Sequence, residues 1–210
     1  SVGIAHTRWA THGKPSLLNT HPFIKDRCAL VHNGIIENFE ELIKFYSLNR
    51  KNLQSDTDSE IIAEVFNQLL HKINDPIEVL NSVIKKIEGT FSFVFLVKGS
   101  KSIYAARKGS PLVLGLSDNT KVICSDILGL PEEVSDLIFL EENDVLEFSE
   151  SFFSIYNQGG IQVERDIHHH ESDKEINDKG EFKHFMQKEI FQEPVSVQDT
   201  ILNFFDKKEE

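Results

Sequence analysis

The chain has 210 residues, enough for one medium-sized domain whose core needs neither disulfides nor a metal for stability. A hydrophobic share of 40% and a charged share of 27% are typical of a globular protein. The formal net charge of -12, with no Lys/Arg cluster, argues against a nucleic-acid partner, and no apolar run is long enough to span a membrane.

The two cysteines, Cys28 and Cys124, each lie in an apolar, strand-like run. We predict buried, reduced core thiols and neither a disulfide nor a nucleophile. No signal peptide precedes the first predicted strand, so a cytoplasmic location is expected. The chain begins at Ser1, without an initiator Met and inside an apolar run, which suggests that it was cut from a longer protein.

Two strands are predicted near the start of the chain, at residues 2–5 and 28–32, with irregular loops between them. The second strand would deliver Asn33 and Gly34 to a turn at its end. Asn-Gly is first of all a turn dipeptide. A side-chain amide next to a backbone amide could also stabilise negative charge that develops on an oxygen atom.

Three amphipathic helices are predicted next. The first covers residues 38–48, and the second opens with a capping box formed by Thr57 and Glu60. The third has Asp75 as its cap and Pro76 at its first position. A helix with one apolar face must bury that face, so we expect these helices to pack on a sheet.

The chain from residue 91 to residue 163 predicts that sheet, because short strands follow one another at close spacing with turn residues between them. We expect a largely antiparallel array. The polar composition of residues 166–179 predicts a surface segment or linker, and residues 182–192 have a helical pattern.

Two charged residues could bind the two ends of a free α-amino acid. Asp58 lies in the first turn of the capped helix, where the helix dipole favours a carboxylate. A purely structural role is the default interpretation there, although an ionised acid could also receive an ammonium group. Arg8, in a loop with Trp9 and His12, could clamp a carboxylate, but an ordinary surface ion pair would explain it equally well.

Metal and cofactor chemistry find little support. Four early histidines, at positions 6, 12, 21 and 32, match no zinc-ligand spacing. The sequence shows no phosphate-cradling glycine loop and no Ser-His-Asp nucleophile elbow. We therefore predict no metal and no cofactor.

Five segments follow one another in the order known from one enzyme family. They are HTRWATHG (6–13), VHNGIIEN (31–38), SDTDSE (55–60), ARKGSPLVLG (106–115) and KGEFKHFMQKEI (179–190). In these motifs the chain resembles the glutamine amidotransferase half of the glucosamine-6-phosphate synthases, also called glutamine–fructose-6-phosphate aminotransferases. The first and last motifs favour this family over other class II amidotransferases, such as the amidophosphoribosyltransferases and asparagine synthetases.

The resemblance implies an α+β fold, the four-layer α/β/β/α sandwich of the N-terminal nucleophile hydrolases, here incomplete at the N-terminus. Residues 1–175 would be a partial amidotransferase domain, and residues 176–210 the linker and the start of an isomerase half. The implied reaction is the hydrolysis of glutamine, whose ammonia passes to the isomerase domain that aminates fructose 6-phosphate. The complete enzyme is expected to be a homo-oligomer.

The resemblance also implies roles for individual residues. Arg8 would bind the glutamine carboxylate with help from Thr11, and Asp58 would take the α-ammonium group. Asn33 and Gly34 would form the oxyanion hole. The full set of implied substrate-binding residues is Arg8, Trp9, Thr11, His12 and Asp58, with Trp9 on the side where ammonia leaves.

The sequence departs from the family at the nucleophile. The family uses an N-terminal cysteine whose own α-amine is the base. Ser1 falls inside the family's domain instead, and neither Cys28 nor Cys124 matches the nucleophile position. We therefore expect this chain alone to be inactive as a glutaminase. A non-catalytic glutamine-binding module and another class II amidotransferase are the alternatives.

Overall fold

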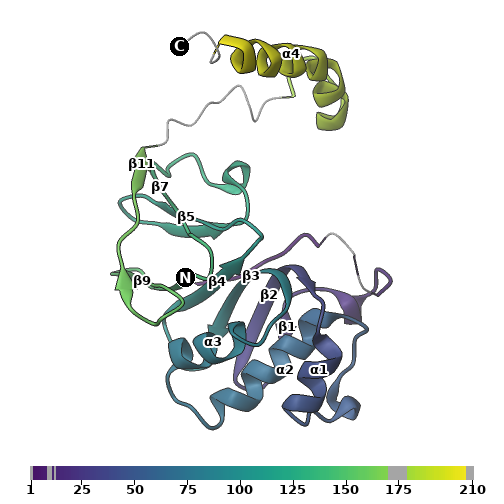
Figure 1. Cartoon of the computed structure of the whole chain (residues 1–210), viewed down its shortest axis with the longest axis vertical. Coiled ribbons are helices and arrows are strands. Elements are labelled where there is room, and N and C mark those ends of the chain that lie inside the picture. Colours follow the sequence, from purple (N-terminus) through teal and green to yellow (C-terminus); the bar gives the residue numbers. More distant parts are fainter. Residues whose placement is uncertain (1, 9–10, 12, 170–178, 207–210) are drawn as a thin grey trace. The chain divides into compact units, whose positions relative to one another are not determined.

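The computed structural model describes residues 2–8, 11, 13–169 and 179–206. The chain divides into two compact units, Ser1–His170 and Glu171–Glu210. Two sheets and the helices α1 to α3 belong to the larger unit, and α4 belongs to the smaller one (Figure 1). None of the described helices combines the length and the hydrophobicity needed to cross a bilayer.

The larger sheet contains seven of the described strands, and each strand runs antiparallel to its neighbours. Their order is β1-β2-β3-β4-β8-β9-β10, with β2 and β3 paired along their whole length. The strands are β1 (Phe23–Ile24), β2 (Cys28–Ile36), β3 (Gly89–Val97), β4 (Ile103–Lys108), β8 (Val145–Phe148), β9 (Phe153–Tyr156) and β10 (Gln162–Val163).

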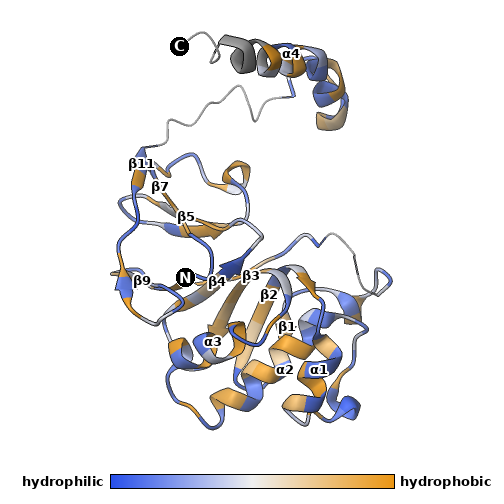
Figure 2. Cartoon of the chain, viewed as in Figure 1, coloured by the Kyte–Doolittle hydropathy of each residue, from blue (hydrophilic) through white to orange (hydrophobic). Residues whose placement is uncertain are grey.

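One face of this sheet is covered by α1 (Phe39–Phe45), α2 (Asp58–Leu70) and α3 (Pro76–Ile84). The fully buried ring of Phe66 on α2 stacks on Phe95 and meets Phe93 edge-on, both from β3. Figure 2 shows apolar colouring on β2, on β3 and on the helices that cover them. Burial of these aromatic side chains provides much of the hydrophobic stabilisation that holds the helices on the sheet.

The opposite face of the larger sheet packs on a second, four-stranded antiparallel sheet in the described residues. Val31, Val94 and Leu146 from the first sheet share a buried cluster with Leu114 and Ile138 from the second. The second sheet has the order β11 (Ile167–His169), β7 (Asp136–Phe139), β5 (Val113–Leu116) and β6 (Lys121–Cys124). Helices and two sheets thus form three successive layers, whereas the helices described for this unit form no layer beyond the second sheet.

The predicted helix starts are confirmed. Thr57 is the N-cap of α2 and accepts a hydrogen bond from the main-chain N–H of Glu60, while Asp75 caps α3 ahead of Pro76. The prediction of a full capping box is wrong, because the Glu60 carboxylate does not bind the N–H of Thr57. It binds Lys25 and the main-chain N–H groups of residues 54 and 55 instead. Short 3-10 turns complete the elements of the larger unit: Leu17–Asn19, Arg50–Asn52 and Ile127–Gly129.

Two predictions about strands are wrong. Residues 2–5 form no strand, because they pair with no other described strand, although Ile4 packs against the core between the two sheets. Asn33 and Gly34 do not lie in a turn, because β2 continues to Ile36 and pairs with the start of β3. Local sequence favoured a turn, and pairing with a distant strand overrode it.

The expected burial of the cysteines holds for one of them. Cys28 is buried in the core beneath the helices, and burial raises the pKa of its thiol to about 12. Cys124 on β6 is only half-buried, so the prediction of a core thiol is wrong there. Both thiols are free.

The C-terminal segment differs in detail from its prediction. Residues 167–169 of the expected linker form β11, while residues 170–178 lie outside the described residues. The predicted helix at 182–192 is found as α4 (Phe185–Asp206), which continues through Pro194. The assignment of residues 176–210 to a linker and the start of a further domain stays a prediction.

Candidate functional site

A cavity of about 250 Å³ lies where the start of α2 meets the second half of β2. Its walls come from the loop around Arg8, from β2, from the first turn of α2 and from Thr90 of β3. Pockets for small ligands typically measure about 300–1,000 Å³, so the volume of this cavity lies just below that range. Its size suits a free amino acid better than a nucleotide.

The structure brings together every described residue that the sequence placed in a site. Arg8, Thr11, Asn33, Gly34 and Asp58 all line this one cavity. The remaining two candidates, residues 9 and 12, lie outside the described residues. Side chains from three separate segments of the chain therefore meet at one place.

The edge of β2 that faces the cavity presents main-chain groups rather than another strand. β1 pairs with β2 only at Ala29 and Leu30. Further along, the N–H of Ile36 donates to Asp58 Oδ2 at 2.8 Å, on the edge away from β3. Alternate residues of a strand point their N–H groups to the same edge, and β2 keeps its register with β3 throughout. The N–H of Gly34 therefore points to the same edge as that of Ile36.

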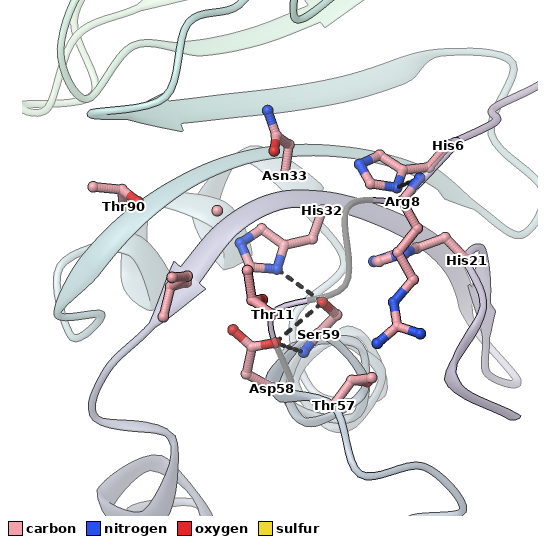
Figure 3. A pocket seen from close by; sticks show the side chains of 12 residues that line it. His6, Arg8, Thr11, His21, His32, Asn33, Thr57, Asp58, Ser59 and Thr90 are labelled. Carbon is pink, nitrogen blue, oxygen red and sulfur yellow. Dashed lines mark hydrogen bonds between the residues drawn. The ribbon is translucent and has the colours of Figure 1, made fainter. Parts of the chain in front are cut away.

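Gly34 occupies a position that no other residue fits. Its φ of +136° is one that side chains rarely adopt, and an added Cβ would lie 2.2 Å from the carbonyl oxygen of Thr90. The requirement for glycine thus comes from close approach to β3 within a strand. Figure 3 shows Asn33 pointing to the opposite side of β2 from His32, as alternation along a strand requires.

The carboxylate of Asp58 is buried, with 5% of the residue exposed, and is held at both oxygens. Oδ2 accepts from the N–H of Ile36, and Oδ1 accepts from the N–H of Ser59 at 2.9 Å. Because Asp58 is also the first residue of α2, the positive end of the helix dipole favours its charge. The result is a fixed anionic group in the wall of the cavity.

His32 and Ser59 stand directly behind this carboxylate. The Nδ1 atom of His32 lies 2.9 Å from Ser59 Oγ, and Ser59 Oγ lies 3.4 Å from Asp58 Oδ1 (Figure 3). Burial lowers the pKa of His32 to about 4, although Asp58 and the Thr90 carbonyl act in the opposite direction. The imidazole is therefore neutral at pH 7.

Arg8 and two further histidines form the other side of the cavity. The Arg8 guanidinium donates to the Gly13 carbonyl at 3.1 Å, and its main-chain N–H donates to His6 Nδ1 at 2.9 Å. The rings of His6 and His21 lie 4.5 Å apart. Burial lowers the pKa of His21 to about 3 and also lowers that of His6, and the Arg8 guanidinium acts in the same direction on both. Arg8 therefore brings positive charge to a wall whose histidines are neutral.

This arrangement offers three kinds of recognition within one small cavity. The guanidinium of Arg8 and the carboxylate of Asp58 can each bind a group of opposite charge. The N–H of Gly34 at the edge of β2 can donate to an oxygen atom. Among the described residues, no cluster of three His, Cys, Asp or Glu side chains could hold a metal ion.

Sequence reasoning missed several residues of the cavity wall, of which His32 and Ser59 matter most. Both stand next to a predicted site residue, His32 before Asn33 and Ser59 after Asp58. Their position next to these residues was the one feature of the sequence that could have indicated a place in the site. Their mutual contact was not visible, because it joins a strand to a helix at a separation of 27 residues.

Comparison with known proteins gives consistent results. A family model described as a glutamine amidotransferase domain matches residues 6–131. A glutamine–fructose-6-phosphate aminotransferase (isomerizing) from Thermotoga maritima is 38% identical over 204 residues, covering 96% of this chain and 33% of the relative. The same enzyme from Haemophilus ducreyi is 38% identical over 95% of the chain and 33% of the relative, and that from Brucella suis is 35% identical over 98% and 34%. The chain thus spans about a third of the length of these relatives.

Solved structures support the fold independently. The glutamine phosphoribosylpyrophosphate amidotransferase from B. subtilis, complexed with ADP and GMP, matches with a TM-score of 0.58 at 18% identity, covering 73% of this chain and 34% of that one. A structure described as the allosteric regulatory enzyme of purine biosynthesis matches with a TM-score of 0.57, also at 18% identity over 73% of this chain and 34% of the other. This likeness confirms the predicted α+β sandwich of antiparallel sheets, of which the described residues of the larger unit form three layers.

Proposed function

This chain belongs to the glutamine amidotransferase domain family, and we propose that its cavity binds glutamine as the ammonia donor for the amination of fructose 6-phosphate. One observation carries the proposal. Arg8, Asp58 and Gly34 come from three distant segments, yet all of them line one cavity of amino-acid size. The relatives that match almost the whole chain bear the name of this reaction.

The two charged walls account for the recognition of a free amino acid. The Arg8 guanidinium pairs with the α-carboxylate, and the Asp58 carboxylate receives the α-ammonium group. Thr11 lies in the same wall as Arg8 and assists there. Because two main-chain N–H groups already fix Asp58, little conformational entropy is lost when the ammonium group binds.

The edge of β2 then takes part in the chemistry. A nucleophile adds to the amide carbon of the glutamine side chain, and the amide oxygen acquires negative charge. The N–H of Gly34 and the side-chain amide of Asn33 stabilise that charge. The C–N bond breaks with protonation of the nitrogen, ammonia leaves, and water releases glutamate from the enzyme.

Neither cysteine of this chain is placed to be the nucleophile. Cys28 lies in the helix-side core with a raised pKa, and Cys124 is on β6 of the second sheet. Neither one lines the cavity. We propose that the nucleophile comes from residues outside these 210, and that the chain supplies the binding groups and the oxyanion donors.

Further parts of the proposal concern the complete protein. Its relatives extend well beyond the matched region, which supports an isomerase domain after the linker at residues 176–210. We place the complete enzyme in the cytoplasm as a homo-oligomer. Trp9 and His12 stay predicted substrate-binding residues.

Calorimetry of the 210-residue chain with glutamine tests the proposal. We expect one glutamine bound per chain, and Arg8→Ala or Asp58→Asn to weaken binding at least tenfold, because each removes a charge-assisted hydrogen bond of about 1.5–3 kcal/mol. Asp75→Asn is the matched control, since it makes the same change at the start of α3, away from the cavity.

Two results would contradict the proposal. If glutamine does not bind, or binds the Arg8 and Asp58 variants as well as the unmodified chain, the cavity is not a glutamine site. Steady ammonia release by the chain alone, abolished by Asn33→Ala, would show that the nucleophile lies within these residues.

A further inference from the structure

His32 and Ser59 form a hydrogen-bonded chain that ends on Asp58. All three residues are buried, with 3%, 4% and 5% of their surfaces exposed. The first hydrogen bond joins His32 Nδ1 to Ser59 Oγ at 2.9 Å, and the second joins Ser59 Oγ to Asp58 Oδ1 at 3.4 Å. These hydrogen bonds reach the Asp58 carboxylate from the protein interior, so the side of Asp58 that lines the cavity stays accessible to a ligand.

The protons of this chain can be assigned from the number of donors. A carboxylate only accepts, so we assign the single hydroxyl proton of Ser59 to Asp58 Oδ1 at 3.4 Å and not to His32 Nδ1 at 2.9 Å. The contact between Ser59 Oγ and His32 Nδ1 then requires a proton on Nδ1. A neutral ring carries no second proton, which leaves Nε2 as an acceptor. Nε2 is buried, and although the Thr90 carbonyl acts on the ring, no hydrogen bond of acceptable geometry joins Nε2 to a described residue. Proteins tolerate an unsatisfied buried acceptor better than an unsatisfied N–H.

A neutral donor suits a carboxylate that must receive an ammonium group. A buried lysine or arginine in place of His32 would also orient Asp58, but its charge would compete with the ligand's ammonium group. The imidazole is neutral at pH 7 because burial disfavours its charged form. It therefore fixes the geometry of the carboxylate without cancelling its charge.

We propose that His32, as the neutral Nδ1–H tautomer and acting through the Ser59 hydroxyl, is a positioning residue that aims the Asp58 carboxylate at the α-ammonium group of the bound amino acid. This inference rests on the proposed function of the cavity, because it assigns selectivity for the α-amino group within it. His32 and Ser59 do not touch the reacting amide. Their loss affects discrimination between ligands with and without an α-amino group.

The tautomer can be measured without any ligand. Long-range ¹H–¹⁵N spectra of the labelled 210-residue chain distinguish protonated from unprotonated ring nitrogens, and His32→Asn identifies the His32 signals by their loss. We expect Nδ1 protonated and Nε2 unprotonated at pH 7. A proton on Nε2, directed at the Thr90 carbonyl, would remove the donor to Ser59 and overturn the assignment.

Selectivity is measured by titrating the chain with glutamine and with 4-carbamoylbutanoate, which is glutamine without its α-amino group. Ser59→Ala removes the link between His32 and Asp58 while keeping the main-chain N–H that also holds the carboxylate. We expect glutamine to bind about tenfold more weakly and 4-carbamoylbutanoate less than twofold more weakly. His32→Leu should have the same effect, whereas His32→Asn, which keeps an N–H close to the Nδ1 position, should retain most of the discrimination.

Ser82→Ala is the matched control, because Ser82 donates to the Val79 carbonyl within α3 and does not line the cavity. If the unmodified chain binds no glutamine, the proposed function itself fails, and this inference fails with it. If the chain prefers glutamine and Ser59→Ala keeps the full preference, only the positioning role is refuted. Equal weakening of both ligands would also refute it, because it would show that the hydroxyl supports the fold alone.

Discussion

Acidification should destabilise this protein through His32. The unfolded chain binds a proton on this histidine near pH 6.5, while burial lowers the pKa in the folded state to about 4. Between these values the unfolded state holds more protons, so stability falls as the pH decreases from 6.5 towards 4 and is fully present only above 6.5. The slope approaches about 1.4 kcal/mol per pH unit, which gives a loss of about 2 kcal/mol between pH 7 and pH 5 from His32 alone.

Other groups act in the same window or below it. His21, with a pKa of about 3, adds to the loss in the same direction, but less than its shift implies because the residue is partly exposed to solvent. Burial alone would raise the pKa of Glu60, but hydrogen bonds from Lys25 and from main-chain N–H groups lower it below 4.5. Glu60 therefore acts below pH 5, and measurements from pH 7 to pH 5 report mainly on histidines.

Urea unfolding at pH 7, 6 and 5 measures the effect. His32→Asn cannot titrate, so its free energy of unfolding should fall by about 2 kcal/mol less than that of the unmodified chain over this range. The comparison uses slopes, so the lower stability of the variant at pH 7 does not matter. Equal slopes for His32→Asn and the unmodified chain would refute the reasoning.

Two further predictions concern stability. Gly34→Ala should lower the free energy of unfolding by about 3 kcal/mol or prevent folding, because the added Cβ meets the backbone of β3. Gly3→Ala is the control: a Cβ there has no atom within 4 Å, so the free energy of unfolding should change by less than about 0.5 kcal/mol. Arg165→Ala leaves the fully buried carboxylate of Asp144 without its paired guanidinium and should lower the free energy of unfolding by about 3 kcal/mol. Lys98→Ala removes an exposed ion pair and should lower it by less than about 1 kcal/mol. Chemical denaturation of the four variants tests both, and equal losses within either pair would contradict it.

The helices could be predicted from sequence because their signals are local. The Thr57 cap and the Asp75-Pro76 start each lie within a few residues of the turn that they define. The extent of β2 could not be predicted in the same way. Its second half is stabilised by pairing with residues 89–92, and Asn-Gly on its own favours a turn.

The candidate site was only partly visible for a similar reason. Arg8 and Asp58 each have an ordinary structural explanation, and only the two together suggest a site for the charged ends of a free amino acid. The contact between His32 and Ser59 belongs to none of the interpretations made from sequence. It depends on how α2 packs against β2, and packing between distant segments leaves no local pattern.

The position of Asn33 and Gly34 within a strand, instead of a turn, has a consequence for the chemistry. A turn after a strand is held only at its ends, whereas these residues are paired with Ser92 and Phe91 of β3 along a continuous register. Donors that stabilise developing charge are most effective when they do not have to reorganise. Ile36, two residues further along the same strand edge, binds Asp58. In the proposed function, one rigid strand therefore fixes the distance between Asp58, which would receive the amino end of glutamine, and the donors proposed for its amide oxygen.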